Sequence, residues 1–313
     1  YDTVANPDET PKAIHVSAFN SMPLAQDFEY ALKGQEAEFQ AGLSALAKIA
    51  PVRLGVSSKQ TSKALLEAKD CDVYVFDGPA PAGNVGVQIN HIDPINKGEV
   101  VWTLGAEEVI MLGRLVKTGK VDYTRTIALA GSEVKAPKYY KMKVGQKLST
   151  LLAGQVSGSD VRIINGNPMT GIKTCADGFL AAHATEVTAI PEGANADEML
   201  GWIMPRFSQF STHRSYFSWL FGSKKEYVLD SRIKGGERHM IMSGEYDKVF
   251  PMDIYAGYLI KAIITGDIDR QEALGIYEVA PEDFAIAEFV CSSKLELQRI
   301  VREGLDILKK ENA

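Results

Sequence analysis

Cysteine is scarce in this sequence, with three residues among 313. Three thiols in a chain of this length do not make a disulfide scaffold, and their scarcity is typical of a protein kept in a reducing, cytoplasmic setting. An iron–sulfur cluster needs about four converging thiolates. Cys71, Cys175 and Cys291 lie far apart along the chain, which argues against a cluster.

Signatures of several other protein classes are also missing. No apolar run approaches the roughly 20 residues that span a bilayer, and no secretory signal opens the chain. The formal net charge is −6 and no long basic run occurs, which argues against nucleic-acid binding. There is no P-loop, no G-x-S-x-G elbow and no metal-binding histidine pair, so the sequence predicts no catalytic residue and no metal ligand. The histidines are His15, His91, His183, His213 and His239.

Strand and helix patterns alternate up to about Lys120. Apolar runs predict strands over 12–19, 52–56 and 71–78. Amphipathic stretches predict helices over 36–50, 61–69 and 105–119. The first of these helices should turn one face to the core, made of Phe39, Leu43, Leu46 and Ile49. This alternation predicts a parallel sheet with crossover helices over residues 1–120.

The pattern changes after this point. Period-two strands and one short helix predict a small α+β unit over residues 121–177. Residues 178–240 add strand signal and a segment rich in aromatic residues, and residues 241–313 are predicted to be helical. The last helix should bury one face, made of Leu297, Val301, Leu305 and Leu308. The polar start "YDTVANPDETPK" indicates a linker from a longer protein, so we expect a further domain upstream.

The first strand-to-helix turn lacks the glycines of a dinucleotide site. Gly34 and Gly42 stand alone there, and the stretch is acidic where phosphate would lie, which argues against FMN or NADH binding. The loop "GPAPAGNVG" follows the third strand, at the sheet edge where α/β proteins place ligands. It is either part of a binding site or a rigid connector. If a quinone or a partner touches this domain, the contacts predicted here are Met22, Pro23, Gly78, Pro79, Gly83, Asn84 and Gly86.

The aromatic segment "GWIMPRFSQFSTHRSYFSWLFG" interleaves rings with Arg206, His213 and Arg214, and Lys224 and Lys225 follow it. This composition suits a protein interface or a membrane surface. The alternative is that most of the rings pack into the chain's own interdomain core. The rings are Trp202, Phe207, Phe210, Tyr216, Phe217, Trp219 and Phe221.

Several long motifs occur in order: "GPAPAGNVGVQINHIDPI", "VWTLGAEEV", "RTIALAGSEVKAPKYYKMKVG", "GWIMPRFSQFS", "GGERHMIMSGEYDKVFPMDI" and "ALGIYEVAPEDFAIAEFVCSSK". Together they resemble the A subunit of the sodium-translocating NADH:quinone oxidoreductase, a family related to the C subunit of the Rnf electron-transport complex and to the flavin-carrying subunit of complex I. The resemblance implies a Rossmann-like domain over 1–120, a β-grasp domain of the soluble-ligand-binding type over 121–177 and a helical domain over 241–313. It also implies that a lipoyl-like domain precedes this chain.

The same resemblance leads to an interpretation of the segment "APEDFAIAEFVCSSKLE". In the related Rnf protein the equivalent stretch carries cluster cysteines. Here the positions that match the spacing C-x2-C-x2-C-x3-C are Pro281, Phe284, Ala287 and Cys291. The segment is interpreted as an emptied cluster site with no metal, in which Phe284 and Ala287 should pack inward near Cys291.

The resemblance further implies a peripheral subunit on the cytoplasmic side of the bacterial inner membrane. In a complex that oxidises NADH, reduces quinone and exports Na⁺, the chain would help to form the quinone site or dock the complex. Its partners would be the other subunits and a quinone, with no covalently bound cofactor and with FMN and Fe–S in other subunits. Two alternatives stay open: a flavin-binding redox subunit with a degenerate phosphate loop, and a purely structural scaffold.

Overall fold

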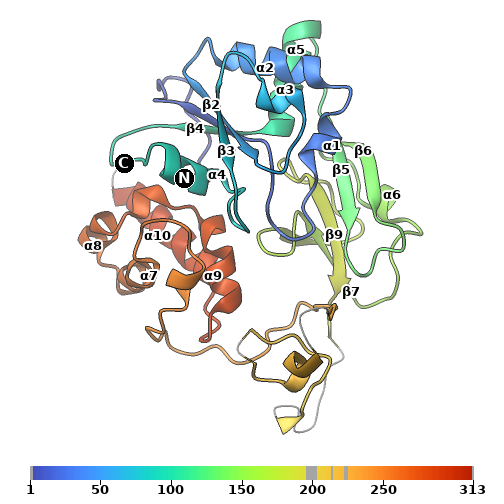
Figure 1. The fold of residues 1–313 in the computed structure, drawn as a ribbon, viewed down its shortest axis with the longest axis vertical. Helices are drawn as coiled ribbons and strands as arrows, with labels where there is room; N and C mark the ends of the chain where they lie inside the picture. The colour runs from blue at the N-terminus through green and yellow to red at the C-terminus, as the bar shows by residue number, and fades with distance from the viewer. Residues whose placement is uncertain (1–2, 195–202, 213, 222–224, 312–313) are drawn as a thin grey trace.

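The computed structural model describes residues 3–194, 203–212, 214–221 and 225–311. Figure 1 shows a sheet with helices at one end of the long axis, a second sheet beside it, and a group of helices on the other side. The predicted combination of α/β and α+β parts is confirmed. None of the described helices has both the length and the apolar character that crossing a membrane requires.

The first sheet is wholly parallel, with strand order β3-β2-β1-β4. Its strands are β1 (Ile14–Ser17), β2 (Val52–Ser57), β3 (Asp72–Phe76) and β4 (Trp102–Gly105). The three predicted strands are confirmed, and β4 was not predicted. It has four residues, none of which is buried, so its apolar pattern is weak.

Helices α2 (Glu36–Leu46) and α5 (Ala106–Thr118) pack closely against each other beside this sheet. A Cβ at Gly113 would lie 1.7 Å from the Glu38 carbonyl oxygen, so a larger residue there would push the helices apart. The predicted core face of α2 is confirmed for Phe39, Leu43 and Leu46. It is wrong for Ile49, which lies beyond the helix end and is exposed.

Three further helices belong to this part: α1 (Phe28–Leu32), α3 (Lys63–Leu66) and α4 (Val85–Ile92). The sequence did not predict α4, because the glycines and prolines before it give the stretch the composition of a loop. Asn84 occupies the N-cap position, and the helix buries Val87 and Ile89. The Gly-rich stretch is therefore a short loop that leads directly into a helix.

The second sheet has strand order β6-β5-β9-β7-β8. Its strands are β5 (Thr124–Ala130), β6 (Lys138–Lys143), β7 (Val161–Asn165), β8 (Ile172–Thr174) and β9 (Glu186–Pro191). The central pair, β5 and β9, is parallel, and the outer pairs are antiparallel. Helix α6 (Ser149–Leu152) contributes Leu151 and Leu152 to the core of this part.

The predicted end of the second domain, at residue 177, is too early. Strand β9 lies within the predicted connecting segment, yet it is hydrogen-bonded between β5 and β7 at the centre of the sheet. The buried Ile127 lies in β5 and the buried Ile163 lies in β7. Strand β9 joins these two strands, because it is hydrogen-bonded to both of them. The second sheet therefore extends to Pro191.

The C-terminal part consists of α7 (Ala256–Thr265), α8 (Ile268–Ala273), α9 (Ala285–Val290) and α10 (Leu297–Glu311), with the 3-10 turns η3 (Tyr246–Lys248), η4 (Ile276–Glu278) and η5 (Pro281–Phe284). The predicted face of α10 is confirmed: Leu297, Val301 and Leu308 are buried, and Leu305 packs against them. Val87 of α4 belongs to the same cluster. The helical part and the first sheet are thus joined by apolar packing.

Most rings of the aromatic segment lie at the surface, around the 3-10 turn η2 (Phe217–Phe221). Phe207, Phe217, Trp219 and Phe221 are all exposed, so these four rings do not form an interdomain core. Phe210 contacts Tyr227 and Phe289. Trp202, His213 and Lys224 lie outside the described residues.

The fully buried Phe284 gives a direct test of the helical core. Replacing Phe284 by Ala should lower the free energy of unfolding by about 3–5 kcal/mol, because the cavity left behind adds to the lost transfer energy. Phe289→Ala on the neighbouring turn is the control, since Phe289 is 41% exposed. Urea unfolding measures the stability of both variants, and equal losses of stability would contradict the buried packing of Phe284.

Candidate functional site

Two loops meet at the carboxyl ends of β1 and β3, the edge where α/β sheets place ligands. Ser17 Oγ lies 2.9 Å from the Gly83 carbonyl oxygen and accepts a hydrogen bond of 2.9 Å from Gln88 Nε2. The Gly83 N–H donates to Ser21 Oγ at 2.8 Å. The turn around Met22 and the loop Gly78–Asn84 are therefore neighbours, although about 60 residues of sequence separate them.

Two glycines are required by close contacts at this edge. A Cβ at Gly83 would lie 2.6 Å from the Ser21 nitrogen, which is main chain and cannot move aside freely. A Cβ at Gly86 would lie 2.6 Å from Asp283 Oδ2. Both glycines thus serve close packing between segments.

The seven predicted contact residues divide into two groups. Met22, Gly83, Asn84 and Gly86 are buried and hold the loops together, whereas Pro23, Gly78 and Pro79 are exposed. Only the exposed group presents a surface to a ligand. That any of them contacts a quinone stays a prediction.

Leu24, which follows Pro23 in the sequence, has an unusual backbone conformation. Its φ is 61°, in the left-handed region that a branched residue rarely adopts, and its side chain is 43% exposed. Such a conformation costs of order 1–3 kcal/mol and persists where the surroundings enforce it, most often at ligand sites. The sequence carried no signal for it. Asn20 helps to set the turn, because its Oδ1 accepts from the Met22 N–H at 2.9 Å.

Asp283 connects the Gly-rich loop to the helical part through hydrogen bonds. Its Oδ1 accepts from Asn84 Nδ2 at 3.0 Å, and its Oδ2 accepts from the Ala280 N–H at 2.9 Å. Asp283 is 1% exposed. Burial raises the pKa of this carboxyl to about 6, against the two hydrogen bonds that lower it. The sequence did not single out Asp283, because its partner is 199 positions away.

The positions of the interpreted cluster site lie close together in the helical core. Phe284, Ala287 and Cys291 are buried in one cluster, so the predicted inward packing is confirmed, and Pro281 is half-buried at the start of η5. The Phe284 ring lies 4.7 Å from that of Phe250. That a cluster once occupied this space stays a prediction.

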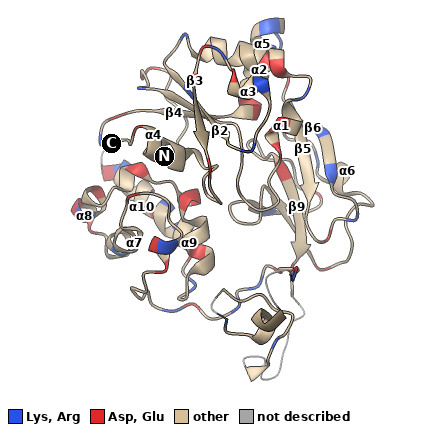
Figure 2. Ribbon diagram, in the orientation of Figure 1, with Lys and Arg blue, Asp and Glu red and all other residues tan. Residues whose placement is uncertain are grey.

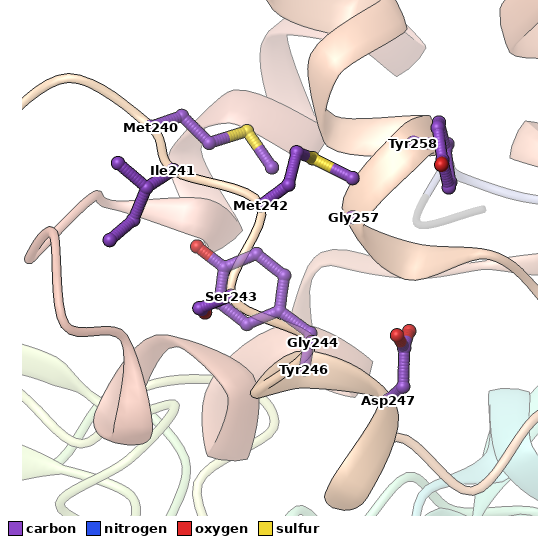
Figure 3. A pocket seen from close by; sticks show the side chains of 9 residues that line it. All are labelled: Met240, Ile241, Met242, Ser243, Gly244, Tyr246, Asp247, Gly257 and Tyr258. Carbon is purple, nitrogen blue, oxygen red and sulfur yellow. The ribbon is translucent and has the colours of Figure 1, made fainter.

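Tyr246 closes the same core. Its hydroxyl lies 3.0 Å from Cys291 Sγ, and burial, with this contact, raises the pKa of the tyrosine. Figure 3 shows the Tyr246 ring beneath the loop of Met240 to Gly244, where a small pocket also touches Gly257 and Tyr258. The pocket has a cavity volume of only about 30 Å³. Ordinary ligand pockets are about 300–1,000 Å³, so this one is too small for such a ligand.

Two of the three thiols lie outside the helical core. Cys71 is half-buried, where burial raises its pKa to about 11, and Cys175 is exposed. In the part of the chain that the structure describes, no three His, Cys, Asp or Glu side chains gather as metal ligands.

Comparison with known families follows the same division of the chain. The family described as the NqrA second alpha/beta domain matches residues 1–121, and the one described as the NQRA C-terminal domain matches residues 126–176. The two matched ranges correspond to the first sheet with its helices and to most of the second sheet.

Relatives that match nearly the whole of this chain include proteins named as the A subunit of the Na(+)-translocating NADH-quinone reductase. The relative from Pasteurella multocida (strain Pm70) is 34% identical over 306 residues, which are 97% of this chain and 68% of that protein. The relative from Saccharophagus degradans is 35% identical over 318 residues, covering 99% of this chain and 70% of that protein. A structure of an NAD⁺-reducing [NiFe]-hydrogenase is 11% identical over 59% of this chain and 41% of its own, with a TM-score of 0.44.

The fold and the site define a class of protein with an α/β part, an α+β part and a helical part, in which a Gly-rich loop at a sheet edge is fastened to the helices. Within that class, the chain belongs to the NqrA family, the A subunits of the Na(+)-translocating NADH-quinone reductase. The resemblance identified from the sequence motifs is confirmed.

Gly86→Ala should destabilise the joint between the loop and the helices. The added methyl group must displace Asp283, and overpacking of this kind costs about 1–3 kcal/mol. Gly236→Ala is the control, because a Cβ there meets nothing within 4 Å. Thermal unfolding measures both variants, and an unchanged Gly86→Ala protein would contradict the contact.

Asp283→Asn should change how stability depends on pH. The folded pKa lies above the unfolded value of 3.8, so this group's contribution is fully present below about pH 4 and is lost as pH rises through about 6. A pKa raised from 3.8 to about 6 corresponds to roughly 3 kcal/mol of stability. Asparagine does not ionise. The free energy of unfolding of the variant, relative to that of wild type, should therefore rise by about this amount between pH 4 and pH 7. Urea unfolding across that range is the measurement, and parallel curves would contradict it.

Proposed function

We propose that this chain is a peripheral subunit, on the cytoplasmic side of the membrane, of a complex that oxidises NADH, reduces quinone and pumps Na⁺. The observation that carries the proposal is its relation, along nearly all of its length, to proteins named as the A subunit of the Na(+)-translocating NADH-quinone reductase. NADH, flavin and iron–sulfur chemistry belong to other subunits in this proposal. The chain itself acts by binding and positioning.

The quinone contact is proposed for the sheet edge between the two loops. A quinone headgroup with an isoprenoid tail needs an apolar surface with a few polar groups. Phe19, Pro23, Leu24 and Pro79 supply apolar surface there, and Asn20 supplies an exposed amide. The serines behind them, Ser17 and Ser21, hold the loops at fixed spacing. In this arrangement the chain orients the headgroup while electrons arrive from a neighbouring subunit.

Photolabelling in the intact complex tests this placement. A photoreactive quinone should label peptides within 17–24 or 78–86, and unlabelled quinone in excess should abolish the label. The peptide that contains Tyr255 and Tyr258 is the control, because both side chains are exposed on the surface of the helical part. Label confined to other subunits would favour the scaffold alternative, and a flavin absorption band in the purified chain would favour the redox alternative.

A charge at the apolar rim should weaken quinone binding. Pro23→Asp places a carboxylate beside Leu24, and we expect the KM for quinone to rise about tenfold, equivalent to roughly 1.4 kcal/mol. Electron transfer from NADH to an artificial acceptor should be unchanged. Pro137→Asp is the matched control, because Pro137 is also an exposed proline but lies in the second part. A quinone KM unaffected by Pro23→Asp would contradict the proposed surface.

A further inference from the structure

The aromatic segment, defined as the described residues 203–212 and 214–221 with Lys225, occupies one extreme of the molecule. Figure 1 places η2 and its loops at one end of the long axis, beyond the ends of β7 and β9, with α2 and α5 at the other end. The segment therefore projects from the body of the protein. A projecting element of this kind is accessible to a large, flat partner.

The apolar side chains of this segment are exposed as a group. The Phe207 ring lies 6.1 Å from Phe217 and 5.9 Å from Phe221, so these rings form a connected patch. Trp219 is 46% exposed and Leu220 is 59% exposed. Contiguous exposed apolar patches mark protein or membrane contact sites, whereas isolated exposed residues need no explanation.

The charge of the segment is opposite to that of the chain. From residue 203 to residue 225 the sequence holds Arg206, Arg214, Lys224 and Lys225 and no Asp or Glu, in a chain of net charge −6. Figure 2 shows the basic residues along these loops. The patch therefore complements an anionic surface.

The cations and the rings are interleaved within this segment. The Arg214 guanidinium lies 5.6 Å from the Trp219 ring centroid, and Lys225 Nζ lies 5.0 Å from that of Phe221. The cores of protein interfaces are depleted in lysine. Aromatic rings placed among Lys and Arg are instead typical of elements that lie at the headgroup level of a membrane, where rings enter the interface and cations meet lipid phosphates.

We propose that the aromatic segment is a membrane-docking surface that binds the headgroup layer of an anionic bilayer. Trp219, Leu220 and Phe221 enter the interface, and Arg206, Arg214 and Lys225 face lipid phosphates. The inference does not rest on the quinone contact, because the aromatic segment shares no residue with the two loops at the edge of the first sheet. It deepens the proposed peripheral location by naming the residues that hold it.

Vesicle cosedimentation of the full chain tests the proposal. The chain should sediment with vesicles of phosphatidylglycerol and phosphatidylcholine, and at least tenfold less with phosphatidylcholine alone. Binding to the anionic vesicles should fall as salt is raised, because screening weakens the attraction to phosphates. Equal sedimentation with both kinds of vesicle, or none with either, would overturn the proposal.

A double variant identifies the surface. W219A/F221A should reduce partitioning into anionic vesicles at least tenfold, measured by cosedimentation. Y255A/Y258A is the matched control, because it removes two rings that are 71% and 60% exposed in the helical part. Circular dichroism confirms that both variants are folded, as expected for exposed positions.

Two results would contradict this assignment. One is vesicle binding by W219A/F221A that equals wild type. The other is a chain that does not bind vesicles while W219A/F221A loses assembly with the membrane subunits, which would make the segment a contact for an acidic protein surface. Loss of vesicle binding with quinone kinetics unchanged would support membrane docking independently of the quinone site.

Discussion

The carboxylate of Asp283, buried between the helical part and the first sheet, fixes how these two parts meet. Its oxygens accept hydrogen bonds from the start of its own turn and from Asn84, the residue that precedes α4. A carboxylate removed from water is costly unless such donors surround it. The cost limits the alternatives, because a different docking angle would remove the Asn84 donor and leave one buried carboxylate oxygen without its partner. Gly86 belongs to the same constraint, since only a residue without a side chain leaves room for the carboxylate.

A similar polar joint links the first sheet to the second. Gln26 Nε2 donates to the Thr126 carbonyl oxygen at 2.6 Å and to Glu107 Oε1 at 3.2 Å, while its backbone N–H donates to Glu186 Oε2. Burial raises the pKa of both Glu107 and Glu186. Nearby, the buried Arg125 pairs with Glu108 at 2.6 Å. Buried polar groups paired in this way favour one arrangement, because breaking a buried pair is expensive. Within the described residues, Glu107 Oε2 and Arg125 Nε have no hydrogen-bond partner.

The sequence predicted those features that depend on short-range periodicity. The apolar stripe of α10 and the strands β1, β2 and β3 were visible because their side chains repeat with the period of the element. Helix α4 was not, since the glycines and prolines before it signal a loop. The outward rings around η2 were left as one of two alternatives, because composition does not say which side of a chain faces water. The sequence did not predict the roles of Asp283, Gln26 and Leu24, because these roles depend on partners far away in sequence or on backbone strain.

Helix α4 has a mechanical consequence. Val87, on its inner face, packs into the core of the helical part, while Gln88 on the next position reaches Ser17 at the end of β1. Eight residues of rigid backbone therefore connect the C-terminal helices to the sheet edge without an intervening flexible link. A displacement at one end of such a rigid, packed helix is transmitted to the elements at its other end. A partner that shifted η5 would move the Gly78–Asn84 loop with it, because Asp283 of η5 holds Asn84 at the end of that loop.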